Sequence, residues 1–288
     1  MKTYTITGGG GLQLHVVEDG NPCGPPLLFI HGWSQSYLAW VNQFNSSLTR
    51  NFRVVTMDNR GHGLSDKPRD VYGESKLWAD DINSVITELT LDRPIVSVWS
   101  YGGMVICDYI RVHGETNLGG VNFVSALTKV GTESAKKVIG EEFFANAIRS
   151  MSENTEECIM GIEGYLWHKA RISFRRATSL VKAQKGSTEP GIDESYLVFG
   201  YNVIVPPFVR AQLFARTLEN DDVLRNITVP VLISHGDKDE VVLPLAGEQL
   251  AALIPRAKYS VYENGGHSLP SENPKRFNQE LRRFALNT

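Results

Sequence analysis

The chain has 288 residues, of which 42% are hydrophobic and 21% charged, and its formal net charge at pH 7 is −3. A chain of this length can bury a large core, and the composition is typical neither of a disordered protein nor of a membrane protein. The slightly negative charge provides no electrostatic attraction to nucleic acid or acidic lipid, so we expect neither as a partner.

The cysteines and the N-terminal residues bear on the compartment. Cys23, Cys107 and Cys158 are widely separated and include no Cys-x-x-Cys pair, so neither a disulfide framework nor a zinc site is indicated. The N-terminal residues contain no apolar run of the length that a signal peptide or a membrane span needs. We therefore expect a cytoplasmic protein that does not associate with membranes.

The first strands are expected at residues 3–7 and 12–18, joined by a turn at the four glycines 8–11. No Lys-Ser/Thr follows these glycines, as it would in a phosphate-binding loop, so a hairpin is the favoured interpretation. Residues 27–30 form a continuous apolar run, which is typical of a strand buried on both faces.

The next strand, at residues 53–57, leads into the segment Asp58-Asn59-Arg60-Gly61-His62-Gly63-Leu64-Ser65. We interpret this segment as a structural turn, in which the glycines reverse the chain and Asp58 and Arg60 form charge-assisted hydrogen bonds. A phosphate site is the less favoured alternative.

Helices and strands then alternate. Apolar residues at helical spacing predict a helix over residues 74–89, and strands are expected at 95–99 and 121–126. Between these two strands, residues 104–110 suit a buried helix. This order predicts a largely parallel sheet with right-handed crossovers.

Between residues 127 and 226 charged and aromatic residues are more frequent, and apolar residues recur at helical spacing. We interpret this segment as a mostly helical cap, with an exposed loop at 186–191 and a break in helix at 205–207. Strands at 229–234 and 258–262 and a helix at 274–286 complete the chain. The prediction is thus an α/β core, residues 1–126 and 227–288, built on a mostly parallel sheet flanked by helices, with an inserted cap at 127–226.

Ser100 stands at a predicted strand-to-helix turn, followed by Gly102 and Gly103. A strained turn lifts a serine hydroxyl clear of the sheet, and small neighbours let the strand and the helix approach each other. The segment resembles the nucleophile elbow of the α/β-hydrolases, usually Gly-x-Ser-x-Gly, and departs from it at Val98. A serine that caps the helix is the structural alternative.

Two later loops carry the same resemblance. Asp239 shortly precedes a Val-x-Pro segment and His267 follows two glycines, so that serine, acid and histidine occur in the α/β-hydrolase order. Each follows a predicted strand, and the C-terminal ends of parallel strands share one edge of a sheet. The resemblance implies that His267 takes the proton of Ser100 and that Asp239 orients the imidazole. Asp237, on the same loop, is the alternative acid.

The loop after residues 27–30 begins His31-Gly32-Trp33 and is similar to the α/β-hydrolase loop that supplies an oxyanion-hole donor. The resemblance implies that the backbone N–H groups of Trp33 and Tyr101 form the hole. We expect His31 to structure the loop rather than to act as a base.

The resemblance implies a serine hydrolase that cleaves carboxylic esters of small, short-chain or aromatic, substrates through an acyl-enzyme. Cofactor-free haloperoxidases and perhydrolases share these motifs and are the main alternative. Hydrolases of carbon–carbon bonds in vinylogous diketones are less favoured, because Ser268 rather than an aromatic residue follows the histidine. A receptor-like binding protein with vestigial hydrolysis is a further alternative, although it has no need of all three side chains.

The pocket is harder to predict than the catalytic centre. We expect Trp33, Trp99, Trp167 and Phe208 to contact substrate, within a wider set of aromatic candidates that also includes Tyr101, Tyr165, Phe174, Phe199, Tyr201 and Phe214. The remaining histidines show no ligand spacing such as His-x-x-x-His, so we expect no metal ion and no organic cofactor.

Overall fold

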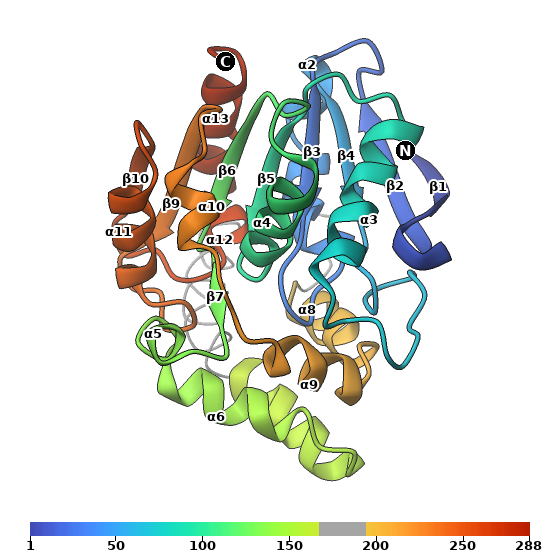
Figure 1. Cartoon of the computed structure of the whole chain (residues 1–288), viewed down its shortest axis with the longest axis vertical. Coiled ribbons are helices and arrows are strands. Elements are labelled where there is room, and N and C mark those ends of the chain that lie inside the picture. Colours follow the sequence, from blue (N-terminus) through green and yellow to red (C-terminus); the bar gives the residue numbers. More distant parts are fainter. Residues whose placement is uncertain (167–193) are drawn as a thin grey trace, which may run out of the picture.

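The computed structural model describes residues 1–166 and 194–288, and its main sheet has eight strands in the order β1-β2-β4-β3-β5-β6-β9-β10 (Figure 1). β2 pairs antiparallel with β1 and with β4, and all other neighbours in this sheet are parallel. The predicted α/β fold with a mostly parallel sheet is confirmed. The strands are Lys2–Thr7 (β1), Gln13–Gly20 (β2), Pro26–Ile30 (β3), Arg53–Met57 (β4), Ile95–Trp99 (β5), Gly120–Val124 (β6), Val231–Gly236 (β9) and Lys258–Tyr262 (β10).

Helices cover both faces of the sheet, which explains the continuous apolar runs of its central strands. Leu28 and Ile30 of β3 belong to a hydrophobic cluster that includes residues of α3, α4 and α11, whereas Leu27 and Phe29 pack with α1, α2 and α13 on the opposite face. Alternate side chains of this strand thus pack into two hydrophobic cores, one on each face of the sheet. The helices are Val41–Phe44 (α1), Leu48–Asn51 (α2), Ser75–Glu88 (α3), Gly102–His113 (α4), Pro244–Leu253 (α11), Leu269–Glu272 (α12) and Pro274–Ala285 (α13), with a 3-10 turn at Tyr37–Trp40 (η2).

The glycine run forms the predicted turn between β1 and β2. Gly9–Gly11 is a single 3-10 turn, closed by a hydrogen bond of 2.7 Å from the N–H of Gly8 to the carbonyl of Leu12. Gly10 and Gly11 have φ angles of 70° and 82°, a conformation that favours glycine.

Between β6 and β9 the chain forms several helices, most of which lie beyond one end of the sheet (Figure 1). Residues 155–166 are helical as well. One helix ends at Val203 and the next begins at Pro207, so the break lies at residues 204–206, close to the expected 205–207. The elements are Lys129–Val130 (β7), Glu133–Lys136 (α5), Glu141–Arg149 (α6), Glu194–Val203 (α8), Pro207–Ala215 (α9), Leu218–Glu219 (β8) and Asp221–Arg225 (α10).

The antiparallel pair β7 and β8 was not predicted, because two-residue strands leave no periodic pattern in a sequence. The bounds 127–226 for a separate cap remain a prediction. The expected loop at 186–191, together with Trp167 and Phe174, lies outside the described residues. We use the term cap helices below for α5, α6, residues 155–166, α8 and α9.

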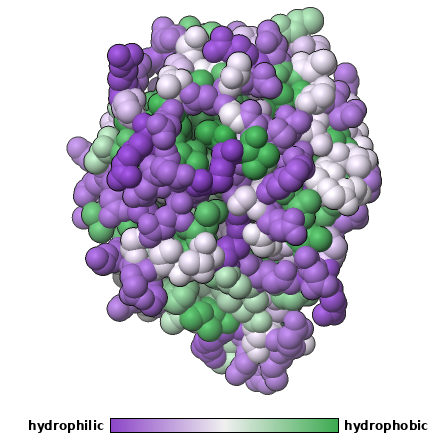
Figure 2. Space-filling model, viewed as in Figure 1, coloured by the Kyte–Doolittle hydropathy of each residue, from purple (hydrophilic) through white to green (hydrophobic). Residues whose placement is uncertain are grey.

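Polar residues cover most of the face in Figure 2, and apolar residues form scattered groups on it. In the described part of the chain no single helix has the length and apolar composition of a membrane span; one bent pair, Leu197–Val203 with Pro207–Ala215, meets that test.

Candidate active site

Ser100 occupies a strained turn between β5 and α4. Its φ angle is 55°, a left-handed conformation that is uncommon for residues other than glycine. Three backbone hydrogen bonds fix the turn. The Ser100 N–H donates to the carbonyl of Val124 at 3.0 Å, and the Ser100 carbonyl accepts from the N–H groups of Gly103 and Leu127, both at 2.9 Å. This is the strand, turn and helix arrangement that the sequence predicts for a nucleophile elbow.

Glycines permit the close approach of chain segments at this turn. A Cβ on Gly32 would lie 2.7 Å from the Cβ of Ser100, and a Cβ on Gly102 would lie 2.9 Å from the carbonyl oxygen of Ile30. The Cβ of Val98 would be 3.4 Å from that same atom on Gly102. A distance of 3.4 Å is an ordinary van der Waals contact, so the backbone of Ile30, and not Val98, is what requires glycine at position 102.

His267 and Asp239 form a buried hydrogen-bonded pair. Nδ1 of His267 lies 2.8 Å from Oδ2 of Asp239, and the two residues are 5% and 2% exposed. The other carboxylate oxygen accepts hydrogen bonds from the N–H groups of Val241 (2.9 Å) and Val242 (3.0 Å). An Nδ1–H that donates to the carboxylate leaves Nε2 of the imidazole as a proton acceptor.

The carboxyl group of Asp239 is held in its ionised form. Burial acts to raise its pKa, but the charge of His267 and hydrogen bonds from His235 and His267 outweigh burial, so that the pKa lies below its ordinary value. Nε2 of His235 is 3.4 Å from Oδ2 of Asp239. Asp237 takes a different position, with its N–H bonded to the carbonyl of Tyr262 at 3.1 Å.

Ser100 and His267 line one cavity, which encloses about 400 Å³ of unfilled space including its opening to solvent. Ser100 itself is 9% exposed. The other lining residues come from the core loops and from the cap helices: Trp33, Gln35, Phe143, Tyr165, Leu166, Asn202 and Val241. The structure thus brings the three predicted catalytic residues to one place, two of them at the cavity wall and Asp239 behind His267.

Two backbone N–H groups near Ser100 have no acceptor in the part of the chain that the structure describes. In the described residues, the N–H groups of Trp33 and Tyr101 donate to no protein acceptor, whereas those on either side of Trp33 are occupied. Gly32 donates to Oε1 of Gln35 at 2.7 Å, and Ser34 donates to Nε2 of His62 at 3.2 Å. Free, fixed N–H donors beside a nucleophile are what an oxyanion hole requires.

Buried imidazoles shape the loop that carries Trp33. Nε2 of His31 accepts a hydrogen bond of 3.0 Å from the N–H of Asn59, which fits its expected structural role. Burial and the neighbouring His31 lower the pKa of His62 to about 3, so His62 is neutral and its Nε2 can accept from Ser34.

The side chains of Arg60 and Asp58 stabilise the turn after β4. Arg60 is paired with Asp81 at 2.7 Å inside the protein, and Asp58 accepts from the N–H groups of Tyr37 (2.7 Å) and Leu64 (2.9 Å). Both charged side chains therefore have structural partners.

The predicted substrate contacts are only partly placed at the cavity. Trp33 lines it and packs against the rings of Phe143, Tyr165 and Phe214, with centroid distances of 5.8, 5.5 and 5.3 Å. Trp167 lies outside the described residues.

For Trp99 the expectation of a substrate contact is corrected. It is 1% exposed, and its indole N–H donates to the carbonyl of His267 at 2.9 Å, because its position in β5 turns it into the core. Phe208 is also placed away from this cavity, beside Tyr72 and Arg69.

Five lining residues are absent from the predicted substrate contacts, and no motif marks them: Gln35, Phe143, Leu166, Asn202 and Val241. Tyr165, which also lines the cavity, belongs to the wider set of aromatic candidates.

In the described residues no group of three or more His, Cys, Asp or Glu side chains is arranged to hold a metal ion.

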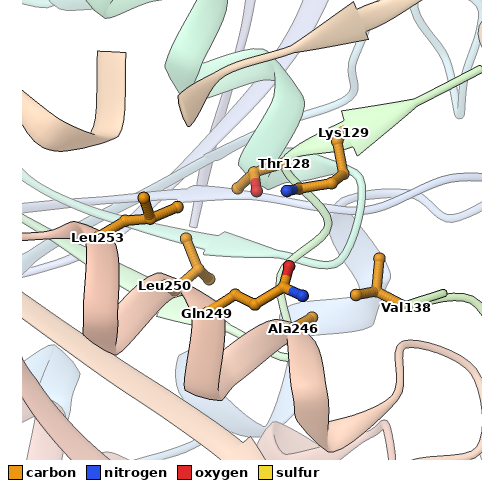
Figure 3. Close-up of a pocket in the computed structure, with 7 residues that line it drawn as sticks. All are labelled: Thr128, Lys129, Val138, Ala246, Gln249, Leu250 and Leu253. Atoms are coloured by element: carbon orange, nitrogen blue, oxygen red, sulfur yellow. The ribbon is translucent and has the colours of Figure 1, made fainter. Parts of the chain in front are cut away.

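A second cavity lies between α11 and β7 (Figure 3). It is lined by Thr128, Lys129, Val138, Ala246, Gln249, Leu250 and Leu253. Lys129, its one charged residue, is paired with Asp221 at 3.2 Å. None of the candidate catalytic residues reaches this cavity.

Comparison with known proteins identifies the class. The family described as alpha/beta hydrolase fold matches residues 25–274, so the chain belongs to the α/β-hydrolase family. The structure is similar to an esterase from Rhodococcus sp. ECU1013, with 33% identity, a TM-score of 0.85 and coverage of 99% and 98% of the two chains. It is also similar to a putative aryl esterase from Burkholderia cenocepacia, with 26% identity, a TM-score of 0.84 and full coverage of both chains.

Curated relatives include haloperoxidases. The chain is 28% identical over 270 residues to non-heme chloroperoxidase CPO-A1 of Kitasatospora aureofaciens, covering 91% of this chain and 92% of the relative. It is 25% identical over 282 residues to a bifunctional esterase/perhydrolase of Acinetobacter calcoaceticus, covering 97% and 98%. The chain is therefore an enzyme of the hydrolase class, from the part of the family that contains esterases and haloperoxidases.

Proposed function

We propose that the protein is a serine hydrolase that cleaves carboxylic esters of small molecules through an acyl-enzyme. The observation that carries this proposal is the pairing of His267 with the ionised Asp239 at the wall of the cavity that Ser100 lines. Free N–H groups of Trp33 and Tyr101 supply the donors that such a reaction needs.

In the proposed reaction, Oγ of Ser100 attacks the ester carbonyl carbon while Nε2 of His267 accepts the hydroxyl proton. The tetrahedral oxyanion accepts hydrogen bonds from the N–H groups of Trp33 and Tyr101. Collapse of this intermediate breaks the bond to the alcohol oxygen, which takes the proton from His267. Water, deprotonated by His267, then attacks the acyl carbon. The second tetrahedral intermediate collapses, the bond to Oγ of Ser100 breaks, and Oγ takes the proton back from His267 as the acid leaves.

Asp239 has a supporting part in both halves of the reaction. Its carboxylate fixes the tautomer of His267 and stabilises the imidazolium that forms in each step. The low pKa of the buried carboxyl keeps this charge in place over the pH range in which an imidazole acts as a base.

The cavity favours short-chain or aromatic esters. Its wall carries the rings of Trp33, Phe143 and Tyr165, which suit a flat apolar group. Solved relatives named as an esterase and as a putative aryl esterase support this substrate class.

Perhydrolysis or haloperoxidase activity is the second candidate, because curated relatives carry the names chloroperoxidase and esterase/perhydrolase. Hydrogen peroxide in place of water would attack the same acyl-enzyme and release a peracid. Only the second half-reaction differs, so the same three catalytic residues serve both activities.

The test is steady-state turnover of a panel of 4-nitrophenyl esters, lactones and vinylogous diketones, with and without hydrogen peroxide. We expect multiple turnovers on esters by the wild type and a loss of kcat of about 10⁴-fold or more in Ser100→Ala. A single burst that stalls would indicate a receptor-like protein, and turnover confined to diketones would indicate carbon–carbon hydrolysis.

A further inference from the structure

Both residues of the candidate oxyanion hole are bonded through their side chains to the same cap helix. The hydroxyl of Tyr101 donates to the carbonyl of Leu213 at 3.0 Å, and the indole N–H of Trp33 donates to the carbonyl of Arg210 at 3.4 Å. Both acceptors belong to α9, Pro207–Ala215. One helix therefore contacts the two chain segments that converge on Ser100 from different strands.

The bond from Tyr101 has a defined physical basis. Because α9 ends at Ala215, the carbonyl of Leu213 has no helical N–H four residues later to bond with. Burial raises the pKa of Tyr101 to about 12, so its hydroxyl keeps its proton and remains a donor. The Tyr101 side chain thus caps the C-terminal turn of α9, while its backbone N–H has no acceptor among the described residues.

Arg210 holds the other segment from the same helix. Its guanidinium is fully buried, and its Nε donates to Oγ of Ser34, the residue after Trp33, at 2.9 Å. Its remaining nitrogens donate to the carbonyl of Ser150, at 3.1 Å, and to the carbonyl of Asn202. Arg210, itself in α9, therefore joins α8 and the residue that follows α6 to the loop that carries Trp33.

The described partners of Arg210 are uncharged. Among the described residues no carboxylate lies within ion-pair distance of its guanidinium, whereas Arg216, just beyond α9, is paired with Asp108 at 2.8 Å. Burying a charge without a counter-charge costs free energy, so a smaller apolar residue would satisfy packing alone at less cost. What the guanidinium provides is a rigid fork of donors in fixed directions.

We propose that α9 fixes the geometry of the oxyanion hole, with Arg210 and the Tyr101 hydroxyl as positioning groups. The inference rests on the proposed function. Oxyanion donors act only when they point at the place where charge develops, so a small rotation of the Trp33 or Tyr101 peptide costs rate without costing substrate binding. The cap helices then position the oxyanion donors in addition to covering the substrate cavity.

The test compares Tyr101→Phe, Arg210→Gln and Ser34→Ala with the control Tyr72→Phe. Tyr72 is a fully buried tyrosine whose hydroxyl has no hydrogen-bond partner among the described residues. We measure kcat and KM on a 4-nitrophenyl ester, the inhibition constant of phenylboronic acid, which forms a tetrahedral adduct with a catalytic serine, and the thermal midpoint Tm.

For Tyr101→Phe we expect kcat to fall about 10-fold, with KM changed less than about twofold and the inhibition constant raised in the same proportion as kcat falls. Arg210→Gln and Ser34→Ala should show the same split between kcat and KM, and their effects should not add, because each breaks the same contact. Tyr72→Phe should retain wild-type kcat. Ser34→Ala and Tyr101→Phe keep the test valid if Arg210→Gln does not fold.

Wild-type kcat and boronate inhibition in Tyr101→Phe and Ser34→Ala would overturn the inference. The inference would also be overturned if the loss of kcat in each variant were proportional to its loss of Tm, with the same proportion in the control Tyr72→Phe. A failure of the proposed function is a different result: a wild type that does not hydrolyse esters, or a Ser100→Ala variant that still does.

Discussion

The carboxylate of Asp239 lies 2.8 Å from Nδ1 of His267, while Asp237, two residues earlier, bonds through its backbone to Tyr262 at the end of β10. Oδ1 of Asp237 is buried and has no hydrogen-bond partner among the described residues, so Asp239 is the aspartate of this loop that is bonded to the imidazole. The family pattern selects Asp239 from the sequence, and this geometry supports the same choice.

Asp239→Asn should lower kcat by about 10⁴-fold with little change in fold, because an amide at this position favours the wrong tautomer of His267. Asp237→Asn is the matched control and should retain kcat within about 10-fold. Both are measured as steady-state kcat on a 4-nitrophenyl ester. A larger loss in Asp237→Asn than in Asp239→Asn would reassign the acid.

Gly32→Ala should inactivate the enzyme and destabilise it by about 1 to 3 kcal/mol, because the new Cβ would lie 2.7 Å from the Cβ of Ser100. Gly73→Ala is the control, since a Cβ there meets nothing within 4 Å. The free energy of unfolding in urea and kcat are measured for both. If the two variants had the same free energy of unfolding and the same kcat, the close approach of the Gly32 loop to Ser100 would be contradicted.

His62 predicts a pH dependence of stability. Burial and the neighbouring His31 lower its folded-state pKa to about 3, whereas an unfolded histidine titrates near ~6.5. Between these values the unfolded chain binds more protons, so the free energy of unfolding decreases as the pH falls from ~6.5, by at most ~1.4 kcal/mol per pH unit for one group. Above ~6.5 this contribution is constant.

The His62→Gln variant isolates this effect, because glutamine offers an acceptor for the N–H of Ser34 and does not titrate. We expect the difference in unfolding free energy between wild type and His62→Gln to shift against the wild type as the pH is lowered from 7 to 4. A difference that stays constant over this range would show that His62 is not held neutral.

Substrate length tests the cavity. The aromatic wall formed by Trp33, Phe143 and Tyr165 should make kcat/KM for 4-nitrophenyl butyrate and benzoate at least about 10-fold higher than for the palmitate. Phe143→Ala should raise KM for the benzoate more than for the butyrate, since it removes a ring that packs against Trp33 at 5.8 Å. Equal rates on C4 and C16 esters would contradict a small pocket.

Much of the core could be predicted from the sequence because its signals are local. Residues 27–30 are a short apolar run and residues 53–57 are rich in β-branched residues, both next to turn residues, and the strands fall there almost to the residue. The elbow at Ser100 follows from the need for glycine where the chain segments touch.

The cap side of the site could not be predicted in the same way. Gln35, Asn202 and Arg210 act through contacts between segments far apart in the chain, and such contacts leave no spacing to recognise. Trp99 was predicted to contact substrate because it precedes the candidate nucleophile in the sequence. Side chains alternate between the two faces of β5, however, and that of Trp99 packs in the hydrophobic core.

The most direct measurement of the central claim is the labelling of the enzyme by 4-nitrophenyl diethyl phosphate, followed by peptide mass spectrometry and by residual esterase activity. We predict one phosphoryl group per chain, carried by Ser100, with activity lost in proportion to labelling and no such label in Ser100→Ala. Full esterase activity in protein labelled at Ser100, or full inactivation with Ser100 unmodified, would contradict a mechanism in which this serine is the nucleophile.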